Sequence, residues 1–125
     1  MTEEDKKALA ADPDGLKTYE YLANNIDTCF DDMDQIVDNM IRVDLSGQFL
    51  ASAARYLHAI EAERYAEPVR RLVSATIDRD REHRYIAELM QSIYGENYLD
   101  RAAELMSTDN NYRRIYKRLY PSNPI

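Results

Sequence analysis

The sequence predicts an all-α fold, organised as a single domain of antiparallel helices. Three observations support this prediction. Glycine and proline, the residues that interrupt helices, number only three and four among 125 residues. Apolar residues recur three and four positions apart through most of the chain, which is the spacing of one helix face. No stretch alternates as a half-buried strand does, and the length suits one hydrophobic core.

The N-terminal segment is predicted to be a short capped helix followed by a turn. Thr2 and Asp5 have the spacing of a capping pair, for a helix expected to run through Ala11. The stretch DPDG at 12–15 is typical of a turn whose aspartates cap the next helix. We expect residues 1–13 to be loosely attached, residues 14–120 to form the helical domain and residues 121–125 to be a tail.

Residues 16–43 carry one continuous apolar stripe, which favours a single helix about 40 Å long at 1.5 Å per residue. The opposite face is marked by four aspartates, at Asp27, Asp31, Asp34 and Asp38. Cys29 is the one cysteine, so an internal disulfide is excluded, and its apolar neighbours predict a small buried side chain. The stretch DLSG at 44–47 ends this segment and supplies caps for the next.

Pro68 is expected to open a helix and not to interrupt one. Proline costs about 3 kcal/mol inside a helix and almost nothing at the first helical position, which predicts a boundary near Ala66. Seven consecutive polar residues, 78–84, predict a turn or a protrusion. Gly95 is typical of a helix end, residues 99–106 of a short helix, and Asp109 of the cap of a last helix.

Similar apolar spacings recur about 31–36 residues apart. The matching sets are Tyr19-Leu22-Ala23-Ile26, Leu50-Ala53-Ala54-Leu57 and Ile86-Leu89-Met90-Ile93. With the stretch RYAEPVRRLVSATID at 64–78, this arrangement resembles the tetratricopeptide repeat, and the resemblance implies stacked antiparallel helix pairs. Two architectures therefore stay open: a bundle of long helices, or three tetratricopeptide-like hairpins with a C-terminal helix.

The net charge of −7 argues against a general nucleic-acid binder, which needs a basic surface. The charge is uneven: residues 1–44 hold twelve acids and four bases, and residues 45–125 hold eleven acids and twelve bases. This asymmetry predicts a weak homodimer. The N-terminus lacks an apolar signal core and no run is long enough to cross a bilayer, so we expect a cytoplasmic protein without a membrane partner.

Motifs of catalysis are absent from the sequence. The three glycines are isolated, which excludes a phosphate-binding loop, and no serine or cysteine has a nucleophile context. We therefore expect no enzyme activity and no cofactor. The alternative is a helical metal-binding protein or metalloenzyme. It would use two helix-spaced pairs of a histidine and a carboxylate, His58 with Glu61 and Asp80 with His83.

The C-terminal stretch YRRIYKRLY, 112–120, combines four bases with tyrosines at i, i+4 and i+8. Such a pattern can stack on bases and neutralise phosphates, which gives a second alternative, a nucleic-acid accessory protein. The competing interpretation is a helix whose tyrosines pack on the body of the domain. A third interpretation docks this basic helix on the acidic first segment, within one chain or between two.

The function that the sequence favours is a non-enzymatic helical interaction module for a protein or peptide partner. Tyrosine and arginine are the residue types that anchor interfaces. Arg-Tyr occurs in both RYLHAI, 55–60, and RYIAEL, 84–89, where the two pairs are expected to be placed alike. The predicted contact residues are Arg55, Tyr56, Arg84, Tyr85 and Tyr94.

Overall fold

The computed structural model describes residues 1–122, and over these residues every regular element is a helix, as the sequence predicts. A 3₁₀ turn, η1 (Phe30–Asp32), precedes α3. The α-helices in chain order are α1 (Glu3–Ala10), α2 (Leu16–Asn24), α3 (Met33–Val43), α4 (Gln48–Glu61), α5 (Ala66–Arg79), α6 (Ile86–Tyr94), α7 (Ala102–Thr108) and α8 (Asn110–Leu119).

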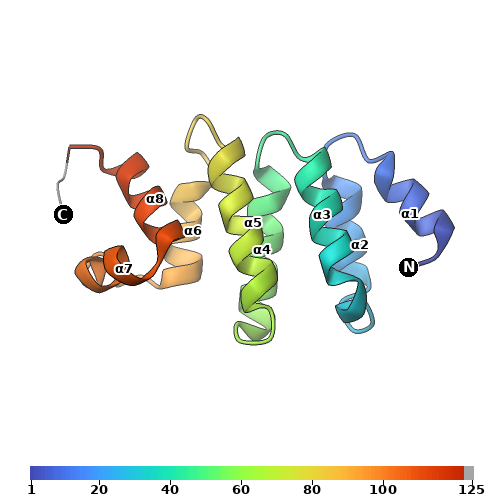
Figure 1. Cartoon of the computed structure of the whole chain (residues 1–125), viewed down its shortest axis with the longest axis horizontal. Coiled ribbons are helices and arrows are strands. Elements are labelled where there is room, and N and C mark those ends of the chain that lie inside the picture. The colour runs from blue at the N-terminus through green and yellow to red at the C-terminus, as the bar shows by residue number, and fades with distance from the viewer. Residues whose placement is uncertain (123–125) are drawn as a thin grey trace.

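The helices form two layers (Figure 1). α2, α4 and α6 lie in one layer, and α3, α5 and α8 lie in front of them in the other. The chain runs through these layers as antiparallel pairs, with α1 beside α3 at one end and α7 beside α8 at the other. The buried core runs along the seam between the layers and includes Leu50, Leu72 and Met90.

The prediction of one long helix over residues 16–43 is wrong. α2 ends at Asn24, and a turn and η1 separate it from α3. Asn25 caps the C-terminal end of α2, where both its backbone amide at 3.0 Å and its side-chain amide at 2.9 Å donate to the carbonyl of Tyr21. The turn brings Cys29 into the core at 1% exposure, as predicted. Because the described helices have 7–14 residues, the bundle of long helices is excluded.

The boundary predicted at Pro68 is confirmed. α4 ends at Glu61, and α5 begins at Ala66, so the proline lies in the first turn of α5, where no intrahelical donor is needed. The polar break at 78–84 is also confirmed in its main part, since α5 ends at Arg79 and α6 begins only at Ile86. Gly95 ends α6 with φ 89°, a conformation that favours glycine.

The last helix is capped and oriented as predicted. The Asp109 carboxylate accepts from the amide of Tyr112 at 3.0 Å. Tyr112, Ile115 and Tyr116 are buried in the core. The interpretation in which the tyrosines of this helix pack on the domain is therefore correct. The tail predicted at 121–125 lies mostly outside the described residues.

The predicted capping pair is present at the N-terminus of α1. The Thr2 hydroxyl accepts from the Asp5 amide at 3.0 Å, and the Asp5 carboxylate accepts from the Thr2 amide at 3.1 Å. α3 holds the other end of this helix, because Asn39 donates to the carbonyl of Leu9 at 2.8 Å and Arg42 to that of Ala10 at 3.0 Å. Loose attachment of residues 1–13 stays a prediction.

Candidate partner-binding surface

Three buried aspartates, Asp12, Asp44 and Asp80, organise the loops that enter α2, α4 and α6. Each carboxylate accepts the backbone amide of the residue six positions later. The distance from the amide nitrogen to the carboxylate oxygen is 2.8 Å for Thr18, 2.9 Å for Leu50 and 2.9 Å for Ile86. These bonds satisfy amides that a helix N-terminus leaves without partners. The three loops lie at the same edge of the molecule (Figure 1).

When the three aspartates are aligned, the first apolar set matches the other two with a shift of one residue. Thr18 lies six positions after Asp12, so Thr18, and not Tyr19, corresponds to Leu50 and Ile86. The loops at 12–15 and 44–47 are also alike in their glycines, since Gly15 and Gly47 have φ of 108° and 94°. The resemblance to tetratricopeptide repeats stays a prediction.

The layer of α2, α4 and α6 carries two of the predicted contact residues side by side. Arg55 and Tyr56 line a shallow hollow of about 290 Å³ with Tyr19 and Ser52. The rings of Tyr19 and Tyr56 meet edge to face, with centroids 6.2 Å apart, which joins α2 to α4. Arg55 pairs with Glu88 of α6 at 2.9 Å. One ring contact and one ion pair therefore link α2, α4 and α6, which are neighbours in this layer.

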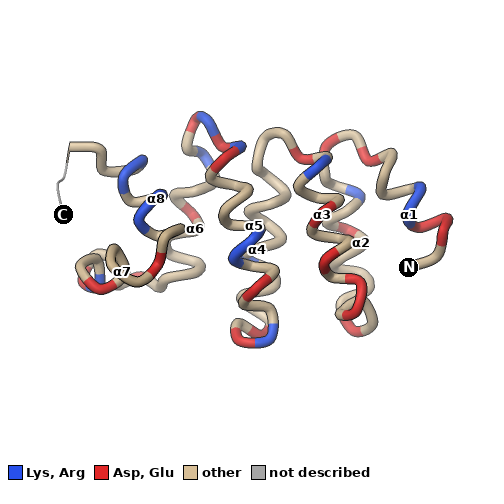
Figure 2. The backbone as a smooth tube through the Cα atoms, viewed as in Figure 1, with Lys and Arg blue, Asp and Glu red and all other residues tan. Residues whose placement is uncertain are grey.

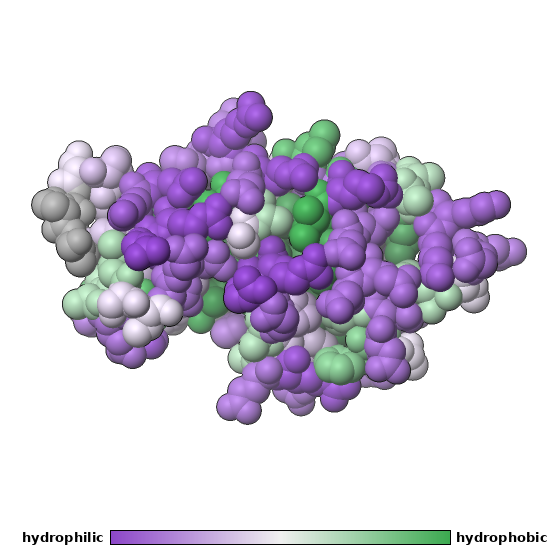
Figure 3. Space-filling view, in the orientation of Figure 1, coloured by the Kyte–Doolittle hydropathy of each residue, from purple (hydrophilic) through white to green (hydrophobic). Residues whose placement is uncertain are grey.

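Arg84 and Tyr85 line a larger groove of about 690 Å³ between two loops. We call this the loop groove. Its walls are the loop after α3 and the loop between α5 and α6, which rise together at the top of Figure 1. The complete lining is Leu45, Ser46, Asp78, Arg79, Asp80, Arg81, Glu82, Arg84 and Tyr85. Figure 3 shows a hydrophobic patch over the first of these loops, beside the hydrophilic projection of the second.

The two Arg-Tyr pairs are not placed alike. Arg55 and Tyr56 lie within α4, whereas Arg84 and Tyr85 precede α6. The difference arises because Asp80 must reach the amide of Ile86, which leaves residues 81–85 as a loop. Arg84 and Tyr85 lie four and three residues before Glu88, which pairs with Arg55.

Tyr94 lies at the other end of α6, away from the loop groove. Its hydroxyl donates to Asp109 at 3.0 Å, and its ring packs edge to face on Tyr112 at 5.1 Å. Burial and the nearby Asp109 carboxylate raise the pKa of Tyr94. This tyrosine therefore supports the cap of α8. Its predicted role in partner binding stays a prediction, at a place separate from the other four residues.

The two pairs of the metal-binding alternative are not brought together. Glu61 pairs with Arg64 at 3.8 Å at one end of the α4–α5 hairpin, and Asp80 lies at the other end. Asp80 is engaged by the amides of Arg84, Tyr85 and Ile86 at 2.7–2.9 Å. Over residues 1–122, no group of three or more histidine, cysteine or carboxylate side chains is placed to hold a metal ion. The four residues named for this alternative therefore do not form one site.

Tyr112 and Tyr116 of the C-terminal stretch face the core, so these two rings are not available to stack on bases. The nucleic-acid alternative itself stays a prediction. Arg114 is also engaged, with Asp78 at 2.6 Å and Ser74 at 3.0 Å. Docking of this helix on the acidic first segment does not occur within one chain. Figure 2 shows α8 at one end of the molecule and the acidic residues of α1–α3 toward the other.

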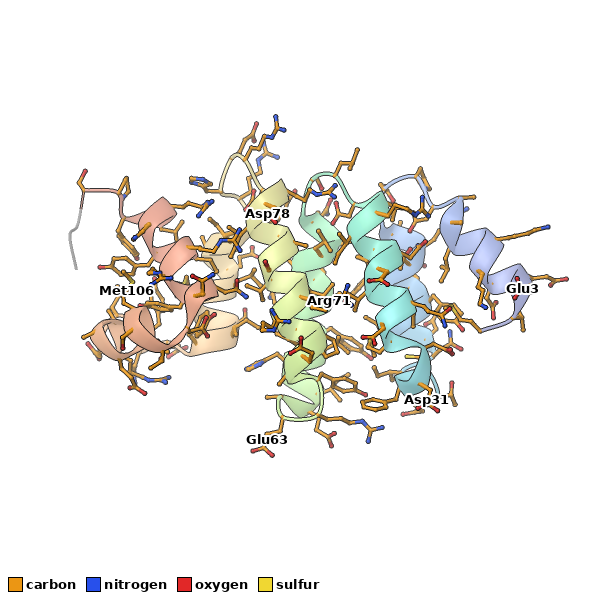
Figure 4. All side chains as sticks on the ribbon, viewed as in Figure 1. Glu3, Asp31, Glu63, Arg71, Asp78 and Met106 are labelled. Carbon is orange, nitrogen blue, oxygen red and sulfur yellow. The ribbon has the colours of Figure 1, made fainter. Side chains whose placement is uncertain are left out.

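Sequence reasoning missed how aspartates and arginines join neighbouring hairpins. Figure 4 shows Arg71 extending from α5 toward α3, where it pairs with Asp34 at 3.7 Å and with Asp38. Arg71 and Asp38 are 33 residues apart, and so are Arg55 and Glu88. The signal in the sequence is this separation, which falls within the spacing of about 31–36 residues between the apolar sets.

Comparisons with known proteins give no match among protein-family models, curated proteins or solved structures. Within residues 1–122, each helix is too short or too polar to cross a lipid bilayer.

Proposed function

We propose that the chain is a non-enzymatic helical interaction module that binds a peptide or helix of a partner protein. The partner would lie across the exposed face of α2, α4 and α6 and reach the loop groove. The observation that carries this proposal is the arrangement of four predicted residues. Arg55 and Tyr56 line the hollow on α2 and α4, and Arg84 and Tyr85 line the loop groove. Arg55 also pairs with Glu88 of α6, the helix that begins directly after Tyr85.

The side chains on this face suit recognition because they are partly fixed before a partner arrives. Tyr56 is held by the ring of Tyr19, and Arg55 by Glu88. An anchor that is already ordered loses less conformational entropy on binding. Tyrosine and arginine also supply the largest share of binding energy in many interfaces. We place this module in the cytoplasm, the compartment that the sequence predicts.

A selection from a random dodecapeptide display library tests the proposal. We compare the wild-type chain with Ser52→Arg, which fills the hollow beside Tyr19 and Arg55 without altering the core. The matched control is Ser107→Arg on α7. Each serine donates to a carbonyl of its own helix, Ser52 to Gln48 at 3.1 Å and Ser107 to Glu104 at 2.9 Å.

The wild-type chain and Ser107→Arg are expected to enrich the same peptides, and Ser52→Arg to bind them at least tenfold more weakly. Circular dichroism and urea unfolding of the three proteins should agree, which separates lost binding from lost folding. The proposal is contradicted if no peptide is enriched, or if Ser52→Arg retains full affinity for the enriched peptides.

A further inference from the structure

We infer that the loop groove receives an acidic segment of the partner that carries an apolar side chain. The inference rests on the proposed function and names the chemistry of the partner. Its basis lies in the charges of residues 1–122. Every carboxylate in the groove is already engaged within the chain, whereas two of the three guanidinium groups have no carboxylate partner among these residues.

The two walls of the loop groove are held together within the chain. The loops approach closely at Gly47, where an added Cβ atom would lie 3.5 Å from the Cβ of Asp80. Arg79 crosses between the loops and donates to the carbonyl of Asp44 at 3.5 Å. The buried carboxylates of Asp44 and Asp80 fix one loop each. The groove consequently keeps its shape when empty.

The acids of the loop groove are all satisfied. Asp78 pairs with Arg114 of α8 at 2.6 Å, and Glu82 pairs with Arg84 at 2.8 Å. Asp80 is buried and accepts three backbone amides. A basic partner would therefore have to break an existing ion pair before it found a carboxylate here.

The bases of the same groove are less engaged. Arg79 is half-buried, and its side chain has the Asp44 carbonyl as its hydrogen-bond acceptor. Arg81 is exposed, and no carboxylate within residues 1–122 pairs with it. Guanidinium groups bind carboxylates with two parallel hydrogen bonds, so Arg81 and the remaining donors of Arg79 match two acids of a peptide. The groove lining holds three acids and three bases, and Arg79 and Arg81 are the bases that no carboxylate within residues 1–122 pairs with.

The apolar part of the recognition comes from the opposite wall. Leu45 is 73% exposed, more than any other large hydrophobic residue that the structure describes, and Tyr85 is half-buried across from it. One exposed leucine is ordinary on a protein surface. Here it stands in the wall of a preformed groove beside arginines without carboxylate partners, which is the combination of an apolar contact and charged rim found in peptide-binding sites.

The peptides enriched by the wild-type chain test this inference through their sequences. Two or more Asp or Glu beside a Leu, Ile, Phe or Tyr are expected, and lysine and arginine should be depleted. The most enriched peptide is then synthesised with a fluorescent label, and its affinity is measured for Arg79→Gln/Arg81→Gln. The matched control is Arg113→Gln/Lys117→Gln, which removes two exposed bases from α8.

We expect at least a tenfold loss of affinity for Arg79→Gln/Arg81→Gln, less than a twofold change for the control, and weaker binding at 0.5 M salt than at 0.05 M. Enriched peptides without acids, or equal affinity for both variants, would overturn the inference. If such peptides still required the hollow at Ser52, the proposed function would stand without it. If no peptide were enriched, the proposed function itself would fail.

Discussion

Asp44 is fully buried, and within residues 1–122 no basic side chain pairs with its carboxylate. Backbone amides stabilise it instead, those of Gly47 and Leu50 at 2.9 Å among them. A carboxylate used in this way replaces several hydrogen bonds that water would otherwise supply to a turn and a helix start. Asp12 and Asp80 accept backbone amides in the same way, so one buried carboxylate holds each of the three loops against the helix that follows it.

Replacing Asp44 by alanine should lower the free energy of unfolding by about 3 kcal/mol, because several buried amides would lose their acceptor at once. Urea unfolding monitored by circular dichroism measures this change. Asp31→Ala is the matched control, since Asp31 is exposed, and we expect a change within about 0.5 kcal/mol. Equal stability of the two variants would show that the carboxylate does not hold the loop.

Asp12 should give the stability of the chain a dependence on pH. Burial alone would raise the pKa of Asp12, but hydrogen bonds from Thr18, Gly15 and Asp14 outweigh burial and lower it. Because the folded state has the lower pKa, the contribution is complete above about pH 4 and is lost as the pH falls further. Urea unfolding between pH 3 and pH 6 should show a smaller decline for Asp12→Asn than for the wild-type chain. Parallel declines would contradict this assignment.

At the scale of the elements, helix boundaries follow from local chemistry where that chemistry is distinctive. Pro68, Gly95 and Asp109 marked their boundaries in the sequence, and the structure confirms each one. Asn25 did not, because an asparagine next to an unbroken apolar stripe resembles any other polar position. The stripe continued across the turn since Ile26 and Cys29 remain packed against the core without being helical.

The candidate surface was predictable in part for the same reason. Arginine and tyrosine are residue types that often anchor interfaces, so Arg55 and Tyr56 could be proposed from the sequence alone. Arg79, Arg81 and Leu45 could not, because their importance depends on which carboxylates are already paired and on two loops that meet at Gly47. Those are properties of the packed helices and are not contained in any one segment.

Pro68→Ala tests the assignment of the helix boundary. We expect a loss of stability of at most about 1 kcal/mol, because proline is compatible with the first turn and mainly restricts the unfolded chain. The comparison is Ser74→Pro in the interior of α5, which should lose about 3 kcal/mol or more. Thermal unfolding of both variants measures the difference. A comparable loss in the two would mean that α5 does not begin at Ala66.

At the scale of the whole molecule, charge is distributed along the stack of helices. The acidic residues of α1–α3 and the basic residues of α8 lie toward opposite ends (Figure 2). Head-to-tail contact between two copies is therefore the geometry that brings unlike charges together. A contact of this kind does not close on itself and would permit longer chains of molecules.

We predict weak self-association that salt suppresses. Sedimentation of the chain at several hundred micromolar and 0.05 M salt should give a mass above that of the monomer, with the monomer restored at 0.5 M salt. Arg113→Glu/Lys117→Glu should weaken the association by removing exposed bases from α8. A monomeric mass at every concentration at low salt would contradict the predicted self-association, the weak homodimer included.

The central claim of a partner-binding face is tested most directly by amide chemical shifts in a ¹H–¹⁵N spectrum, recorded as the most enriched peptide is added. We predict that the largest shifts fall in residues 44–47 and 79–85 and along the exposed face of α4, with little change in α3 and α8. Shifts concentrated in α3, α5 and α8 would place binding on the opposite layer and contradict the claim.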